Sequence, residues 1–189
     1  MDKKRTEKDY LIKEDTAGAT TRSESFEDEY SPEKYIERGH ISADDNAAFR
    51  KITDCIKCFG IYYEGYQRGT VPHPLFDNIE ICFVKLINHG EWINTMTNDE
   101  NIIYEENIDP VKNQNTIERW VDSERDIRYV FVSTKNHPKN RPYIFKGEYT
   151  LNKEATIREK RAVWERTAIE VPTIREKLKV GSGYIEKEE

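Results

Sequence analysis

The sequence predicts an α+β domain: a curved, mostly antiparallel sheet or partly open β-barrel, from about residues 61 to 170, with an amphipathic helix packed on it. Residues 126–133 and 142–149 alternate with a period of two, so Tyr129 and Phe131 fall on one face and Val130 and Val132 on the other. The segment between them is rich in Asn and Pro, which favour turns. We therefore predict two antiparallel strands here, and a third over residues 161–169.

The helix is predicted over residues 43–59, at the N-terminal side of the sheet. Ser42 provides a helix cap, and Gly60 provides a stop. Between them, apolar residues recur at spacings of three and four, which is typical of about four turns of amphipathic helix. These residues are Ala48, Phe49, Ile52, Cys55, Ile56 and Phe59.

Local patterns predict the remaining elements. Ser31 and Pro32 predict the start of a short helix that ends at Gly39. Aromatic and β-branched residues predict a strand or turn over residues 61–66, and strands over residues 79–87 and 102–104. After a loop of residues 109–115, residues 116–121 predict a helical turn with Trp120 on its apolar side. A last short helix is predicted over residues 171–179.

Length and composition indicate one domain, residues 31–179, between a flexible charged arm (1–30) and a frayed acidic tail (180–189). The chain has 189 residues, of which 35% are charged. Its three cysteines, an odd number, favour a reducing compartment over a disulfide scaffold. No apolar run is long enough to cross a bilayer, so we expect a cytoplasmic protein without a membrane partner.

The distribution of charge singles out one segment of an otherwise acidic chain. The formal net charge is −6, but residues 134–166 carry nine Lys or Arg against four Glu. A basic segment laid on aromatic strands is typical of a surface that meets phosphates. It can equally be a solvated face that protects a sheet edge from aggregation.

Two motifs suggest metal chemistry, and neither is complete. Cys55 and Cys58 form a C-x-x-C pair, but no second pair with zinc-ligand spacing follows, and buried thiols are the simpler interpretation. Asp77, Glu80 and Lys85 resemble the residues of a metal-dependent nuclease, but Glu80 and Lys85 are an odd number apart and so face opposite sides of a strand. We therefore predict no catalytic residues, no metal site and no cofactor.

The second half of the chain resembles a known family. The order of elements runs from Glu91-Trp92 through Tyr104 to the strands Tyr129–Val132 and Tyr143–Gly147 and then to Ala162–Trp164. It resembles the C-terminal domain of unknown function found on some restriction-type helicases and nucleases, which is similar to the PUA/SRA-like β-barrels that read modified bases. The resemblance covers about residues 90 to 166. This chain departs from the pattern at Ser133, at Lys146 and in the polar stretch 105–107.

The resemblance, with the cations on an aromatic sheet, implies a nucleic-acid-binding module that reads modified DNA in a restriction or host–phage defence context. Planar rings could sandwich an extruded base, although most aromatic residues must fill the core. The predicted base pocket is Trp92, Tyr104 and Trp164. The predicted phosphate contacts are Lys135, Lys139, Arg141, Lys146, Arg158, Lys160 and Arg161.

An alternative of another class remains open at the level of the sequence. An acidic protein could be a phage-encoded inhibitor whose carboxylates occupy the phosphate-binding groove of a nucleic-acid-binding defence enzyme. The acidic total favours this alternative, and the basic segment opposes it. Its acidic residues would be Asp99, Glu100, Glu105, Glu106 and Asp109, together with those of the N-terminal arm.

Overall fold

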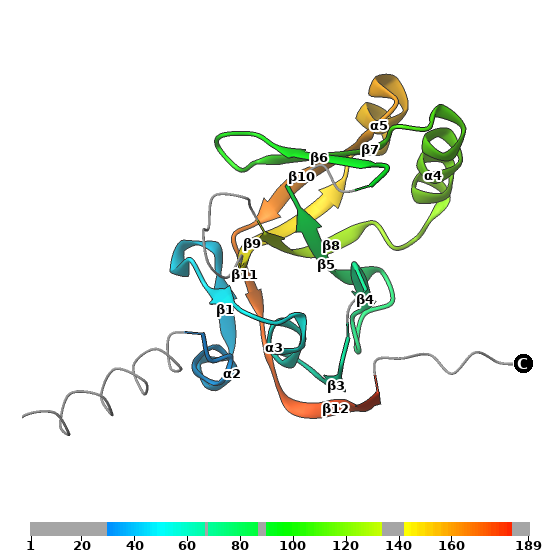
Figure 1. Ribbon diagram of the computed structural model, residues 1–189. Helices are drawn as coiled ribbons and strands as arrows, with labels where there is room; N and C mark the ends of the chain where they lie inside the picture. The colour runs from blue at the N-terminus through cyan, green and yellow to red at the C-terminus, as the bar shows by residue number, and fades with distance from the viewer. Residues whose placement is uncertain (1–29, 67, 87–89, 134–141, 183–189) are drawn as a thin grey trace, which may run out of the picture. The chain divides into compact units, whose positions relative to one another are not determined.

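The computed structural model describes residues 30–66, 68–86, 90–133 and 142–182 (Figure 1). All of the helices and strands below lie in one compact unit, Pro32–Glu189. In chain order they are α2 (Glu33–Arg38), β1 (His40–Ser42), η1 (Ala43–Asp45), β2 (Ala48–Phe49), α3 (Ile52–Lys57), β3 (Phe59–Glu64), β4 (Thr70–Pro72), β5 (Ile79–Lys85), β6 (Trp92–Met96), β7 (Ile102–Asn107), α4 (Pro110–Asp122), β8 (Ile127–Ser133), β9 (Tyr143–Leu151), α5 (Lys153–Glu159), β10 (Ala162–Ala168), β11 (Glu170–Pro172) and β12 (Ile174–Ser182). None of the helices in the described ranges has the length and apolar character needed to cross a membrane.

The main sheet joins its strands in the order β4-β5-β8-β9-β10-β7-β6, and β2 pairs with β9 beside this path. Within this sheet every pair is antiparallel except β5 and β8, which run parallel. The Asn94 side-chain amide in β6 donates a hydrogen bond to the Lys85 carbonyl oxygen in β5 (3.2 Å), so the last strand of the path returns toward β5. The predicted curved, mostly antiparallel sheet in an α+β domain is therefore confirmed, and it is a partly open barrel rather than a closed one.

Alternation along the strands gives this sheet two apolar faces. On the outer face, Tyr129, Phe131 and Phe145 pack in one core with residues of the N-terminal elements, such as Phe49 and Phe59. The second core lines the interior face, and it contains Cys82, Val84, Ile103, Val130, Val132, Tyr149, Leu151, Ala162 and Trp164. Because both of its faces are covered, β8 is buried at nearly every position, whereas β9 alternates buried and half-buried residues.

The predicted helix of residues 43–59 is wrong, because three shorter elements replace it. Asp45 accepts a hydrogen bond from the Ser42 backbone N–H, closing the single turn η1, and Asn46 in the left-handed region (φ 48°) ends it. β2 then pairs with β9, and only Ile52–Lys57 is α-helical. The apolar spacing arose because successive elements face the same core, not from one helical repeat.

Other elements also differ from the predictions. The predicted helix of residues 171–179 is wrong, because β11 and β12 occupy this segment and β12 pairs in parallel with β3. β12 continues to Ser182, past the predicted domain boundary at residue 179. The helical turn around Trp120 is the end of a longer helix, since Asp109 caps α4 and Pro110 occupies its first turn. The short helix that ends at Gly39 is confirmed as α2. The predicted arm of residues 1–30 lies outside the described residues except for its last one.

Gly147 in β9 gives a direct test of the sheet geometry. It has φ +112°, and a Cβ atom there would lie 2.3 Å from the Ala168 carbonyl oxygen. We expect Gly147→Ala to lower the free energy of unfolding by more than about 1 kcal/mol, because the new methyl group meets backbone in a conformation that alanine disfavours. Gly69→Ala is the control, since a Cβ there meets nothing within 4 Å. Urea denaturation measures both, and equal stability of the two variants would contradict this register.

Candidate functional site

A buried arginine lies at the centre of the interior face. The Arg128 side chain is 5% exposed and forms ion pairs with Glu80 (2.7 Å) and Glu105 (2.5 Å). Glu80 is its register neighbour in the parallel β5–β8 pair, whereas Glu105 comes from β7, three strands away along the sheet. Strands that far apart can bond only across a concave surface, so the interior face is the concave one.

Tryptophan rings extend from this arginine in a column. The Arg128 guanidinium lies 3.7 Å from the ring centroid of Trp164 and 5.2 Å from that of Trp120. The Trp120 centroid in turn lies 6.0 Å from that of Trp92. We call these four residues, Trp92, Trp120, Arg128 and Trp164, the tryptophan–arginine column. Cation–π contacts of desolvated Arg with Trp are among the stronger of their kind, so the column holds α4 firmly on the sheet.

The charge of the column is fixed by its partners. Burial alone would lower the pKa of Arg128, but its interactions with Cys82, Glu105 and Glu80 outweigh burial and raise the pKa above its usual value. The Trp164 indole N–H donates to Glu105 Oε2 (3.0 Å), the same oxygen that Arg128 contacts. Glu105 is thus held in one position with Oε1 able to accept a further hydrogen bond.

Asn94 supplies an unsatisfied polar atom beside this carboxylate. In the β6–β7 pair Asn94 lies directly opposite Glu105, and Trp92 lies opposite Asn107. Side chains opposite each other in antiparallel strands are neighbours on one face. The Asn94 amide nitrogen bonds Lys85, but its Oδ1 is buried and has no hydrogen-bond partner among the described residues. An unpaired buried acceptor costs about 1–3 kcal/mol, so this atom is a candidate ligand contact.

The structure separates the three predicted base-pocket residues. Trp92 is half-buried on the interior face. Trp164 is also interior, but it is 1% exposed and Arg128 covers its ring. Tyr104 is next to Glu105 in β7, so its side chain lies on the opposite face of the sheet. The Arg161 guanidinium lies 3.7 Å from the centroid of its ring. Only Trp92 therefore combines an interior position with an accessible ring, and it lies beside Asn94 and Glu105, which sequence reasoning did not place in the pocket.

The predicted phosphate contacts do not form one surface. Lys146 is 12% exposed and bonds Glu100 (2.5 Å). Arg158 is 70% exposed, Lys160 is exposed, and Arg161 bonds Glu159 (3.0 Å); these three lie at the end of α5 and the start of β10. The other three, Lys135, Lys139 and Arg141, lie outside the described residues. The α5 corner is therefore the described part of this prediction that gathers cations, and Glu159 pairs with both Arg158 and Arg161 there.

Outside the N-terminal arm, four of the five acidic residues named for the inhibitor alternative are bonded within the fold. Asp99 accepts from Thr97 and Asn101, and Asp109 caps α4. Glu100 pairs with Lys146, and Glu105 pairs with Arg128. The ion pairs neutralise the charges of Glu100 and Glu105, whereas the neutral donors leave Asp99 and Asp109 charged. Nothing in these contacts favours the inhibitor alternative.

A cavity of about 670 Å³ borders the column on its Glu80 side. Its lining includes Arg119, Trp120, Arg125 and Arg128 together with Glu80. Glu80 accepts a hydrogen bond from Arg128, and the Arg125 guanidinium donates one to the Asp77 carbonyl oxygen. These side chains therefore already have partners within the fold. Across the described residues, no group of three or more His, Cys, Asp or Glu could hold a metal ion.

The three cysteines are free and buried. Burial raises the pKa of each thiol, that of Cys82 to about 12 from an ordinary value of 9.0. The unfolded chain therefore loses thiol protons above about pH 9 that the folded chain keeps, so this contribution to stability falls as pH rises from there.

We expect all three thiols to resist Ellman's reagent at pH 8 in the native protein, because thiolates react and these groups stay protonated and covered. In denaturant, three equivalents of thiol should react at once. Rapid reaction of the native protein, at the rate of the denatured chain, would contradict the burial of these side chains.

Comparisons with known proteins bear on what this site binds. The family model described as "SET and RING associated domain" matches residues 34–173. Among solved structures, the chain is similar to "The 5-Hydroxymethylcytosine-Specific Restriction Enzyme AbaSI", with 32% sequence identity and a TM-score of 0.71. That match covers 84% of this chain and 52% of the enzyme's chain, so this chain spans about half of the enzyme's length. A search of curated proteins finds no match.

Proposed function

Because the chain belongs to the SET and RING associated (SRA) domain family, we propose that it reads a modified cytosine in duplex DNA. The similar restriction enzyme is specific for 5-hydroxymethylcytosine, which makes that base our first candidate. We place the function in restriction or host–phage defence. In this role the domain recognises the base, and we assign no catalytic residue in the described part of the chain.

The observation that carries the proposal is the buried, unpartnered Asn94 Oδ1 beside Glu105. A chain that leaves a buried acceptor unsatisfied gains when a ligand supplies the donor. The cytosine edge presents the exocyclic N4 amino group as a donor, and a 5-hydroxymethyl group adds an O–H donor. Thymine presents an O4 acceptor at the same place. Two adjacent acceptors, Asn94 Oδ1 and Glu105 Oε1, therefore favour a cytosine over a thymine.

A base can reach this site only outside the helical stack. Proteins that bind individual bases extrude them and pack them on aromatic rings. In this domain, the half-buried Trp92 is the ring next to the two acceptors, and the rest of the column holds Trp92 through Trp120. We therefore revise the base pocket to Trp92, Asn94 and Glu105, with Trp164 as a support rather than a stacking surface.

Phosphates of the duplex would meet cations at the rim. The described candidates are Arg158, Lys160 and Arg161 at the α5 corner. Lys135, Lys139 and Arg141 are further candidates from the sequence, and Lys146 would first have to leave Glu100. Each phosphate neutralised by a cation releases counterions, so affinity should fall steeply as salt rises.

A fluorescence-anisotropy titration at two salt concentrations tests the reader. We expect tighter binding to a duplex with one 5-hydroxymethylcytosine than to the unmodified duplex, with salt weakening both complexes. Asn94→Leu should reduce that preference by about tenfold, since one good polar base contact contributes about 1–3 kcal/mol of discrimination. Thr95→Val is the control, because Thr95 is the next residue of β6 and is exposed. Equal affinity of the native chain for both duplexes would contradict the proposal.

A further inference from the structure

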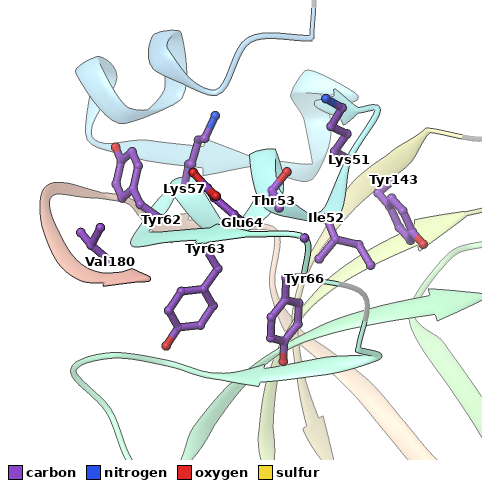
Figure 2. A pocket seen from close by; sticks show the side chains of 11 residues that line it. Lys51, Ile52, Thr53, Lys57, Tyr62, Tyr63, Glu64, Tyr66, Tyr143 and Val180 are labelled. Carbon is purple, nitrogen blue, oxygen red and sulfur yellow. The ribbon is translucent and has the colours of Figure 1, made fainter. Parts of the chain in front are cut away.

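We call Trp92, Asn94 and Glu105 the interior site. A second recess, lined by none of these three residues, lies at the end of β3. It is about 790 Å³ in volume, within the range of small-molecule and cofactor sites. Its walls come from the start of α3, the end of β3 and the turn after it, the first residue of β9, and β12. Four tyrosines, Tyr62, Tyr63, Tyr66 and Tyr143, contribute to its lining, so we call it the tyrosine pocket (Figure 2).

Contacts with neighbouring residues fix the positions of three tyrosine rings in this pocket. Tyr63 and Tyr66 are stacked, with centroids 5.9 Å apart and planes at 29°. The Tyr66 hydroxyl donates to the Thr70 carbonyl oxygen, which fixes that ring. Tyr143 packs against Phe83 edge to face. Tyr66 is thus buried as a support, whereas Tyr63 and Tyr143 remain half-exposed toward the pocket.

Cations accompany these rings. The side chains of Lys51 and Lys57 line the pocket, and Lys177 lies 4.8 Å from the ring centroid of Tyr62. The one acidic residue in the lining is Glu64, and Lys57 also bonds Asp54 (3.1 Å). Lys51 is exposed at the start of α3. Aromatic surfaces with cations beside them match a ligand that combines planar rings with negative charge.

We propose that the tyrosine pocket is a second nucleic-acid site, which binds unpaired bases and phosphates of single-stranded DNA without regard to modification. Figure 2 shows Tyr62 and Val180 at one end of the pocket and Tyr143 at the other, with Tyr63 and Tyr66 between them. The half-exposed rings along this row, Tyr62, Tyr63 and Tyr143, suit successive nucleotides of a strand better than one enclosed mononucleotide. Stacking on aromatic rings tolerates any base, because every base has a π-face.

This site is chemically different from the interior one. The tyrosine pocket offers ring faces, lysines and hydroxyl groups, and these do not distinguish cytosine from thymine. The interior site offers two acceptors beside one tryptophan, which does distinguish them. The two sites share no residue, so the tyrosine pocket can bind a strand whether or not the interior site reads a base.

The test uses the full chain and an unmodified, fluorescein-labelled oligothymidylate of about twelve nucleotides. We expect salt-sensitive binding that Tyr63→Leu weakens by about tenfold, in line with the loss of one stacked base. Tyr104→Leu is the matched control: it also removes a half-exposed tyrosine next to a cation, but in β7, and we expect a change below about twofold. Lys51→Glu, on an exposed residue that does not endanger folding, should weaken binding as well.

Different variants test the modified-base site and the tyrosine pocket, so either can be excluded without the other. Tyr63→Leu should leave the preference for the modified duplex intact, and Asn94→Leu should leave oligothymidylate binding intact. Absence of oligothymidylate binding by the native chain at low salt would overturn the second site. Binding that is equal in the native chain, Tyr63→Leu and Lys51→Glu would overturn it too, because the strand would then lie elsewhere.

Discussion

Replacing Arg128 with methionine is expected to lower the free energy of unfolding by about 3–5 kcal/mol. The change leaves the carboxylates of Glu80 and Glu105 buried without their cation, and removal of one partner from a buried ion pair typically has a cost of this size. It also removes the guanidinium that lies against the rings of Trp120 and Trp164. Urea denaturation followed by tryptophan fluorescence measures the difference.

Lys146→Met is the matched control for this prediction. It removes the same charge from an ion pair on the same sheet, but its partner Glu100 is 35% exposed and also contacts Arg166. After the change Glu100 keeps its access to solvent and its second cation, so the loss should be about 1 kcal/mol or less. Combining Arg128→Met with Glu80→Gln and Glu105→Gln should recover part of the stability, since no buried charge then remains unpaired. A loss for Arg128→Met no larger than that of the control would contradict the account of the column.

Glu105→Gln is expected to weaken binding of the 5-hydroxymethylcytosine duplex by at least about tenfold, with a smaller effect on the unmodified duplex. Glutamine keeps the shape of the side chain, but it replaces a charged acceptor with a weaker neutral one and breaks the charge balance around Arg128. Polar contacts to a base edge contribute about 1–3 kcal/mol each. The loss should therefore appear mainly in the ratio of the two affinities.

Glu106→Gln makes the same chemical change one residue further along β7. Successive side chains of a strand point to opposite faces, so the Glu106 side chain does not point to the interior face. We expect its ratio of affinities to equal that of the native chain. Thermal unfolding of both variants checks that binding is compared between folded proteins. If Glu106→Gln lowered the preference as much as Glu105→Gln, the base would not enter from the interior face.

The central strands β8 and β9 were predictable because local sequence signals mark both their apolar residues and their ends. Every residue of β8 after the first is buried, and in β9 buried residues alternate with half-buried ones. Both strands also end at turn signals. The helix of residues 43–59 was not predictable in the same way. Phe49 and Ile52 fit a helical spacing, but they reach the core from β2 and α3, and only the pairing of β2 with β9 reveals this. Such a pairing depends on residues nearly a hundred positions away.

Position in the sheet separates the three residues predicted for the base pocket. Trp92 and Trp164 lie on one face, in the two strands that flank β7, whereas Tyr104 of β7 lies on the other face. Parity within β7 separates Tyr104 from Glu105, and the sequence does not say which parity faces the concave side. A signal for Arg128 was available: a charged residue within an otherwise apolar central strand must find a buried partner. Asn94 gave no such signal, because its missing partner is visible only in three dimensions.

The most direct measurement of the central claim is the fluorescence of 2-aminopurine placed next to 5-hydroxymethylcytosine on the same strand of a duplex. Extrusion of the modified base removes a stacking neighbour, so saturating protein should raise the fluorescence several-fold. Asn94→Leu, at concentrations that still saturate the duplex, should raise it much less. An unchanged signal with the native chain fully bound would show that the base stays stacked, and this would contradict the reading of the base at Trp92, Asn94 and Glu105.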